Sequence, residues 1–343
     1  MNLARKKDTK NSEVIENTDD LVTSIIGEMN EKHGEGTSML LEGSSMASIN
    51  KWVGSGAATL DAILGGGYPA GRVVEIFGAE SNGKTTFALE ALAATQRDGG
   101  IGIFLDTEHA LDKGWAVKLG VDLKKLVYAQ PETMEKLFDY VENTVELIAK
   151  KAPDKLITIV WDSVAATPTQ SEVDGDYGDS VMGIHARIMS QAFRKITKMI
   201  SSHNVLFICL NQIRAKIGVS FGNPHETFGG KSLKFYSSIR MEVKKVGTLK
   251  DGKGIECKVK IVKNKVAPPF GETVVNISST EPIYGIDRYT AVLTNGFDAG
   301  LFGKSKGWFE IEGKNTRIAD AIQYLIDNPE QLKLYEDTLL SLD

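Results

Sequence analysis

Gly78-Ala79-Glu80-Ser81-Asn82-Gly83-Lys84-Thr85 is the stretch that decides the fold of this chain. It matches the pattern G-x-x-x-x-G-K-[ST], in which glycines let backbone N–H groups turn inward around a phosphate. Residues 72–77 before it are typical of a strand, and residues 85–97 after it are typical of an amphipathic helix whose N-terminus carries partial positive charge. The context therefore predicts a nucleotide site, with Lys84 on the β- and γ-phosphates and Thr85 on Mg²⁺.

Strand-like and helix-like segments alternate on both sides of this loop. Apolar stretches typical of strands lie at 73–77, 102–106, 156–161 and 205–210, and helical patterns lie at 85–97, 132–151 and 182–202. Apolar strands that alternate with helices are buried on both faces. The pattern predicts an α/β fold with a mostly parallel sheet covered by helices on both faces.

The chain is predicted to have three parts. Residues 1–33 hold a polar arm and a helix at 19–33, which places Leu21, Ile25 and Met29 on one face and is expected to pack on a neighbouring subunit. Asp19 or Asp20 is expected to cap this helix. Residues 34–281 form the core, including a strand pair at 236–246 and 255–265 joined by the turn-rich residues 250–254, and residues 282–343 form a small α+β domain with a helix at 319–327.

The composition is that of an ordinary globular protein. Hydrophobic residues make up 42% and charged residues 25% of the 343 positions, and the net charge is -5. No apolar run approaches the roughly 20 residues of a membrane span, and the polar, basic N-terminus shows no signal peptide. Cys209 and Cys257 lie in apolar runs and are expected to be reduced core residues, which favours the cytoplasm.

Polar side chains follow three of the predicted strands. Glu108 follows the strand at 102–106, Asp162 ends the strand at 156–161, and Gln212 follows the strand at 205–210. Strand ends of open parallel sheets are where such folds bind ligands. Glu108 is a candidate to deprotonate the attacking water, although a carboxylate there could also cap a helix. Asp162 is the expected partner of Mg²⁺, and Gln212 is placed to contact the γ-phosphate.

The segment after Gln212 is locally basic. Residues 213–245 carry seven lysines and arginines against two glutamates, although the whole chain is acidic. Such a stretch is often only a solvated surface. Residues 213–230 are also rich in glycine and follow a nucleotide-contacting position, so they predict a ligand-binding loop that nucleotide orders or moves. A second polar, glycine-bearing segment lies at 174–183.

Taken together, these residues resemble the bacterial RecA recombinase family over nearly the whole chain. The strings that carry the resemblance are GAESNGKTT (78–86), FLDTEHALD (104–112), VWDSVAA (160–166), GDSVMG (178–183), MSQAFRK (189–195), LNQIRAKIGVSFGNP (210–224), GGKSLKFY (229–236) and KIVKNKVAPPFGE (260–272). The resemblance is specific because loop segments match as well as the ATPase motifs. It implies a RecA-like P-loop ATPase core between an N-terminal helix and a small C-terminal domain.

The resemblance implies a DNA-dependent ATPase that uses ATP and Mg²⁺. Glu108 would be the base and Gln212 the γ-phosphate sensor, while Lys263 and Lys265 would reach the nucleotide of an adjacent subunit. Thr85 and Asp162 would hold the metal. Contacts to the nucleotide would come from Gly78, Ala79, Glu80, Ser81, Asn82, Gly83, Lys84, Thr85, Thr86, Asp112 and Trp115. Trp115 stands where the family usually has tyrosine, which keeps an aromatic ring for the adenine.

The resemblance also implies that the segments 174–183 and 213–230 bind DNA. The implied DNA-binding positions are Met182, Arg187, Arg194, Arg214, Lys216, Ile217, Gly229 and Gly230. Contacts to phosphates carry no sequence information, which suits a protein that must accept any sequence. Ile217 is either an apolar wedge between bases or a residue that packs within its own loop. The implied partners are single-stranded DNA, homologous duplex DNA, further copies of the chain in a helical filament, and single-strand-binding and loader proteins.

The chain departs from the family pattern at a few positions. Ala215, Phe228 and Lys231 stand where other residues are usual, and the printed sequence ends without a long acidic tail. The divergent C-terminal part suggests an outlying member, of phage or other mobile origin. Two alternatives to a strand-exchange protein stay open: a ring-forming DNA helicase with the same ATPase core, and a scaffold that uses ATP only to polymerise on DNA.

Overall fold

A computed structural model describes residues 17–42, 49–176, 183–215, 225–249, 252–303 and 307–341. The chain divides into two compact units, Met1–Ser48 and Ile49–Asp343, and each is described by itself. The predicted domain boundaries after residues 33 and 281 stay predictions.

The first unit contains the predicted N-terminal helix, α1 (Thr18–His33). Its cap is Asn17, whose side chain accepts a hydrogen bond from the backbone of Asp19 at 3.1 Å, so the expectation that Asp19 or Asp20 caps the helix was wrong. An asparagine at this position supplies the same oxygen as an aspartate. Leu21 and Ile25 of the expected apolar face are exposed.

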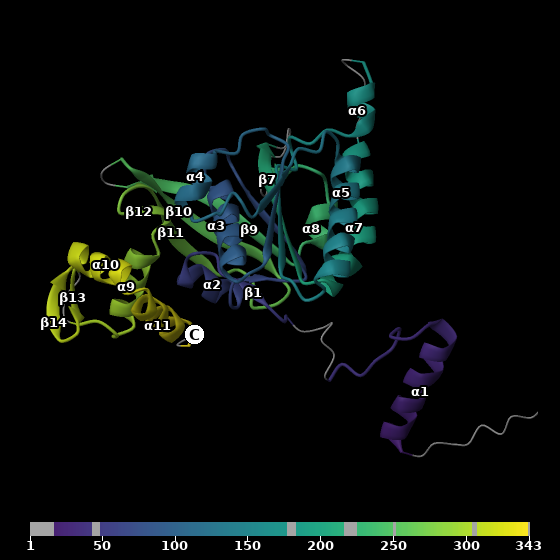
Figure 1. Cartoon of the computed structure of the whole chain (residues 1–343), viewed down its shortest axis with the longest axis horizontal. Coiled ribbons are helices and arrows are strands. Elements are labelled where there is room, and N and C mark those ends of the chain that lie inside the picture. The colour runs from purple at the N-terminus through teal and green to yellow at the C-terminus, as the bar shows by residue number, and fades with distance from the viewer. Residues whose placement is uncertain are drawn as a thin grey trace, which may run out of the picture. The chain divides into compact units, whose positions relative to one another are not determined.

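A large sheet forms the centre of the second unit, in the order β12-β11-β10-β9-β3-β7-β6-β4-β5 (Figure 1). The parallel part contains β5 (Leu126–Ala129), β4 (Ile101–Asp106), β6 (Ile157–Asp162), β7 (Val205–Ala215), β3 (Arg72–Gly78) and β9 (Ile239–Thr248). The antiparallel part adds β10 (Gly254–Asn264), β11 (Glu272–Thr280) and β12 (Ile283–Ile286), and β8 (His225–Thr227) pairs with β7. The predicted α/β class and the four predicted strands are confirmed.

Helices cover both faces of this sheet, as predicted (Figure 1). Alternate residues of β3 show why: Val74 and Ile76 pack with α3 (Lys84–Arg97) and α2 (Ala58–Leu64), whereas Val73 packs with α5 (Met134–Lys151) and α7 (Ile184–Ser202). Side chains of a strand point to opposite faces in turn, so a strand covered on both sides is apolar throughout. Both cysteines are free and buried in these cores.

The predicted strand pair exists, but its first strand begins three residues later than expected. Tyr236, where the strand was expected to begin, is instead the last residue of a short helix, α8 (Ser232–Tyr236). The Ser237 N–H bonds to Leu233 O at 2.9 Å, and Ser238 then starts the pairing by donating to Val73 O. Leu233 of this helix is buried, whereas Phe235 is exposed. So short an apolar run does not distinguish a helix from a strand.

The C-terminal part has a small core of its own, built around Leu293, Phe302 and Leu325. It consists of α9 (Arg288–Asp298), β13 (Trp308–Ile311), β14 (Lys314–Arg317), α10 (Ile318–Asp327) and α11 (Pro329–Leu340). The predicted helix at 319–327 is confirmed within one residue. The remaining short elements of the second unit are β1 (Trp52–Val53), β2 (Tyr68–Pro69), α4 (Lys113–Lys118) and α6 (Gln170–Asp174).

Candidate functional site

A cavity of about 530 Å³ lies at the carboxyl edge of the parallel strands. The carboxyl-terminal parts of β3, β4, β6 and β7 meet there, and each strand contains or is followed by a polar residue that the sequence predicted for the site. The cavity is lined by residues 80–86, Glu108, Asp162, Gln212, Ile255 and Ile277. Parallel strands bring their carboxyl ends to one edge, which is why positions far apart in the sequence meet here.

Strands β9 and β11 pack against the phosphate-binding loop. Gly78 has no room for a side chain, because a Cβ there would lie 2.1 Å from Val243 O of β9. The Asn82 side chain donates to the same carbonyl oxygen at 3.0 Å. Gly83 caps α3 with a φ of 85°, in the left-handed region that glycine favours, and a Cβ there would meet Ile277 of β11. The glycines of the motif are therefore required both for the turn and for packing against β9 and β11.

Lys84 opens α3 and folds back over the loop. Its ammonium donates to Ala79 O at 2.7 Å and to Gly78 O at 3.2 Å. Burial lowers the pKa of Lys84, while the carboxylates of Asp162 and Glu108 raise it. These two carbonyl contacts hold a positive charge over the loop whose N–H groups the motif turns inward.

Thr85 and Asp162 form a second pair in the cavity. The Thr85 hydroxyl donates to Asp162 Oδ2 at 2.9 Å. Burial raises the pKa of Asp162 to about 6, and the negative charges of Glu108 and Asp106 add to the shift. A hydroxyl and a buried carboxylate are oxygen ligands of the kind that Mg²⁺ uses, and a cation would relieve the repulsion among these acids. The residues present therefore fit a magnesium ion.

Glu108 connects three strand ends. It accepts a hydrogen bond from the hydroxyl of Ser163, which follows Asp162 across a cis peptide bond. The Gln212 side chain also donates to Glu108 Oε1, at 3.4 Å. The predicted base and the predicted γ-phosphate sensor are therefore in direct contact. Ser163 was missed as a partner of Glu108, because nothing in its sequence position indicates which carboxylate it would reach.

An aromatic pair lies beside the first turn of α3. The Trp115 ring donates to the Thr86 hydroxyl at 3.3 Å, and its edge packs on Tyr284 of β12 with ring centroids 6.4 Å apart. Asp112 caps α4 by accepting from the Trp115 N–H at 3.0 Å. The sequence analysis missed Tyr284, which only the antiparallel extension of the sheet brings to Trp115. The ammonium of Lys118 lies 4.5 Å from the Tyr284 ring.

Lys263 and Lys265 do not line this cavity. Lys263 donates to the carbonyl oxygens of Lys234 and Phe235 at the end of α8, and Lys265 donates to Phe235 O at 3.4 Å. Burial and the positive charges of Lys265 and Arg240 lower the pKa of Lys263 to about 8. Within one chain these lysines therefore form a separate basic group.

Five of the predicted DNA-binding positions lie in the described part of the chain, on α7 and on the segments that flank β8. Arg187 and Arg194 are exposed on that helix, seven residues apart and so on one face, and Arg214 is exposed near the end of β7. The backbone of Gly229 lies against the same helix, where a Cβ would approach Met189 Sδ to 2.5 Å, and a Cβ at Gly230 would lie 3.1 Å from that of Ala186. Met182, Lys216 and Ile217 lie outside the described residues.

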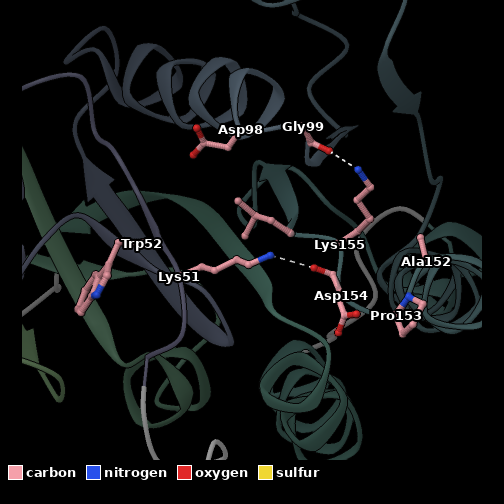
Figure 2. Close-up of a pocket in the computed structure, with 9 residues that line it drawn as sticks. Lys51, Trp52, Asp98, Gly99, Ala152, Pro153, Asp154 and Lys155 are labelled. Carbon is pink, nitrogen blue, oxygen red and sulfur yellow. Dashed lines mark hydrogen bonds between the residues drawn. The ribbon is translucent and has the colours of Figure 1, made fainter. Parts of the chain in front are cut away.

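A second hollow, of about 570 Å³, lies near the opposite edge of the sheet. Figure 2 shows Lys51 and Lys155 reaching across it, and both ammonium groups donate to backbone carbonyls, of Asp154 at 2.9 Å and of Gly99 at 2.8 Å. Residues 98–99 and 152–156 of its walls come just before β4 and β6, so the hollow lies at the amino edge of the sheet. Ligands of open α/β sheets bind at the carboxyl edge, so the cavity at Lys84 is the candidate site.

Comparisons with known proteins give one family model and several relatives that match most of the chain. The family model of the RecA N-terminal domain matches residues 20–284. Protein RecA of Prochlorococcus marinus (strain MIT 9515) is 43% identical over 316 residues, which cover 91% of this chain and 82% of that protein. Protein RecA 1 of Myxococcus xanthus is 43% identical over 320 residues, covering 91% and 90%. Protein RecA of Desulforapulum autotrophicum is 42% identical, covering 91% and 89%. In the described part of the chain, no helix is both long and apolar enough to cross a membrane.

Proposed function

Since this chain belongs to the RecA family, we propose that it is an ATP-dependent recombination and repair protein of the cytoplasm. It polymerises on single-stranded DNA, pairs that strand with a homologous duplex and promotes strand exchange. Its turnover of ATP to ADP and phosphate depends on DNA. Single-strand-binding and loader proteins are its expected partners.

The observation that carries the proposal is the contact between Gln212 and Glu108. Gln212 lies in β7, three residues before the strand ends at Ala215, and the segment 213–230 follows it directly in the chain. A side chain that touches both the base and the γ-phosphate position is placed to report the nucleotide to that segment. Nucleotide and DNA should then raise each other's affinity, because linkage between two sites is reciprocal.

The hydrolytic step uses the groups of the cavity. The Glu108 carboxylate takes a proton from a water whose oxygen attacks the γ-phosphorus, and ADP leaves as the bond to the β-phosphate oxygen breaks. Lys84 and the N-terminus of α3 hold the phosphate oxygens. Thr85 and Asp162 would hold Mg²⁺, which supplies positive charge next to the phosphates. Asp112, Trp115 and Tyr284 would face the adenine of the nucleotide.

The remaining assignments concern neighbouring molecules. Lys263 and Lys265 contribute charge to the nucleotide of an adjacent subunit, which is supported by their place outside the cavity of their own chain. Arg187, Arg194, Arg214, Gly229 and Gly230 hold DNA phosphates. The positions Met182, Lys216 and Ile217 are proposed for the same role on sequence alone.

The proposal is tested by ATP hydrolysis with and without single-stranded DNA, at two salt concentrations. We expect stimulation that is independent of sequence and that weakens with salt, because phosphate contacts release counterions. Turnover that ignores DNA would contradict the proposal. Closed rings in micrographs together with strand unwinding would support the helicase instead, and filaments without turnover would support the scaffold.

Arg214→Ala tests the DNA assignment directly. We expect weaker binding to all single-stranded sequences and a salt dependence reduced by about 0.7 in the slope of log K against log salt, the value for one lost phosphate contact. Fluorescence anisotropy with labelled oligonucleotides measures both. An unchanged slope would remove Arg214 from the phosphate contacts.

A further inference from the structure

Four side chains form a cluster near the ends of the two proposed DNA-binding segments, 174–183 and 213–230. His185 Nε2 lies 2.6 Å from Glu172 Oε2, and the edge of its ring packs on Phe228 with centroids 4.8 Å apart. The guanidinium of Arg214 lies 4.6 Å from the centroid of the Phe228 ring. Among the described residues, His185 Nδ1 has no hydrogen-bond partner, so Glu172 is the polar anchor of the ring.

Each pair in this cluster closes one segment. Glu172 precedes the segment 174–183 and His185 follows it, so their contact ties the two ends of that segment together. Arg214 stands near the start of the segment 213–230 and Phe228 near its end, so their contact does the same for the second segment. The contact between His185 and Phe228 then joins the ends of one segment to the ends of the other.

Two members of the cluster, Glu172 and Phe228, are anchored in the fold. Glu172 belongs to a capping box in α6, where its carboxylate accepts from the Thr169 N–H at 2.6 Å. Phe228 is held by its backbone, since its carbonyl accepts from the Asn211 side chain at 3.0 Å and its N–H faces Gln212 O at 3.4 Å. Asn211 in turn donates to the buried Glu75 at 2.9 Å. Because Asn211 and Gln212 both contact the Phe228 backbone, a movement of Gln212 would also move Phe228.

We propose that Glu172, His185, Phe228 and Arg214 form a clasp that positions the two DNA-binding segments relative to each other. His185 and Phe228 are positioning residues. They orient Arg214 for a phosphate, and they couple the position of one segment to the position of the other. This inference rests on the proposed function. The occupant of the clasped surface is the phosphate backbone of single-stranded DNA.

The test is a double-mutant cycle on the full-length chain, with His185→Ala, Phe228→Leu and the double variant. Each single change should weaken binding of a labelled oligonucleotide in the presence of ATP by about threefold to tenfold, because it removes an aromatic or cation contact. DNA-free ATP hydrolysis should not change. The double variant should lose no more than the stronger single one, because both changes break the same link.

Two further variants make the result unambiguous. Phe228→Tyr keeps the ring and should restore affinity and DNA stimulation, which a simple loss of folding would not. Gln323→Ala alters an exposed glutamine of α10, outside the clasp and outside the proposed DNA-binding positions, and should behave as the unchanged protein. Additive losses in the cycle, or no loss in either single variant while the unchanged protein is stimulated by DNA, would overturn the clasp. An unchanged protein that DNA does not stimulate would instead overturn the proposed function.

Discussion

Two regions of the second unit contain carboxyl groups whose pKa is raised by burial, but the groups that surround these carboxyls differ. In the cavity at the carboxyl edge, burial raises the pKa of Asp162 to about 6. Where the core meets the C-terminal part, burial raises the pKa of Asp61 to about 6 and that of Glu90 to about 7. The first acid shares an open cavity with Lys84 and Thr85.

The acids of the second region are tied to their own protein. Asp61 accepts from the Ser55 N–H at 2.8 Å, and Glu90 accepts from the Ile286 N–H at 3.4 Å. Nearby, Arg288 makes a two-pronged contact with Glu336 at 2.8 and 2.5 Å. A shifted pKa by itself therefore does not mark a functional acid, because burial produces the same shift in both regions. Substitutions should separate the two regions: changes in the cavity should affect turnover, and changes at the C-terminal junction should affect stability.

The largest effect is expected for Lys84→Ala. Turnover of ATP should fall by about 10³-fold or more, because a charge aimed at the transferred phosphoryl group is removed. Steady-state hydrolysis measures this, with Lys150→Ala, an exposed lysine of α5, as the control. Normal turnover in the Lys84 variant would show that this cavity is not the site of hydrolysis.

Glu108→Gln should lower turnover by about 10²- to 10³-fold, the range for a lost general base. Glutamine keeps an oxygen that can accept from Ser163, so ATP binding and filament formation should persist. Hydrolysis, nucleotide binding and negative-stain microscopy check the three properties separately. A variant that hydrolyses ATP at the normal rate would reassign the base.

Glu90→Gln should change stability and leave turnover alone. The folded state keeps the Glu90 proton up to about pH 7, while the unfolded chain releases it near the ordinary value of 4.5, so the free energy of unfolding falls as pH rises through this window. A glutamine has no proton to release. We expect it to raise the free energy of unfolding at pH 8 by about 3 kcal/mol, at about 1.4 kcal/mol per pKa unit, and to have no such effect at pH 4.

Urea unfolding at several pH values measures this difference. Glu146→Gln, which alters an exposed glutamate of α5, is the matched control. A variant whose stability follows the same pH dependence as the unchanged protein would show that Glu90 does not titrate in this window.

The smallest effect is expected for Arg288→Met, which leaves the carboxylate of Glu336 without its partner. The loss should be about 2 kcal/mol of unfolding free energy, less than for a fully buried pair because 36% of the Arg288 side chain is accessible. Thermal unfolding and ATP hydrolysis are measured on the same sample. If turnover fell while stability held, the C-terminal junction would have a role in the reaction.

Much of the site could be predicted from local patterns. The loop at 78–85 is defined by glycines, a lysine and a threonine at fixed spacing, so it can be recognised from the sequence before the fold is known. Glu108, Asp162 and Gln212 follow apolar strands, and parallel pairing then brings them to one edge. By contrast, Ser163 and Tyr284 were missed, because their partners Glu108 and Trp115 lie 55 and 169 positions away in the chain.

The sequence by itself determined the α/β class, the nucleotide loop and the acids at the strand ends, because these depend on side-chain period and on residues next to each other. Only the tertiary structure decided what packs against the loop, where Val243 O excludes any side chain at Gly78. It also decided what joins the two segments proposed to bind DNA, where His185 meets Phe228. Both depend on contacts between segments that are distant in sequence. Such contacts follow from strand order and packing, which no local pattern encodes.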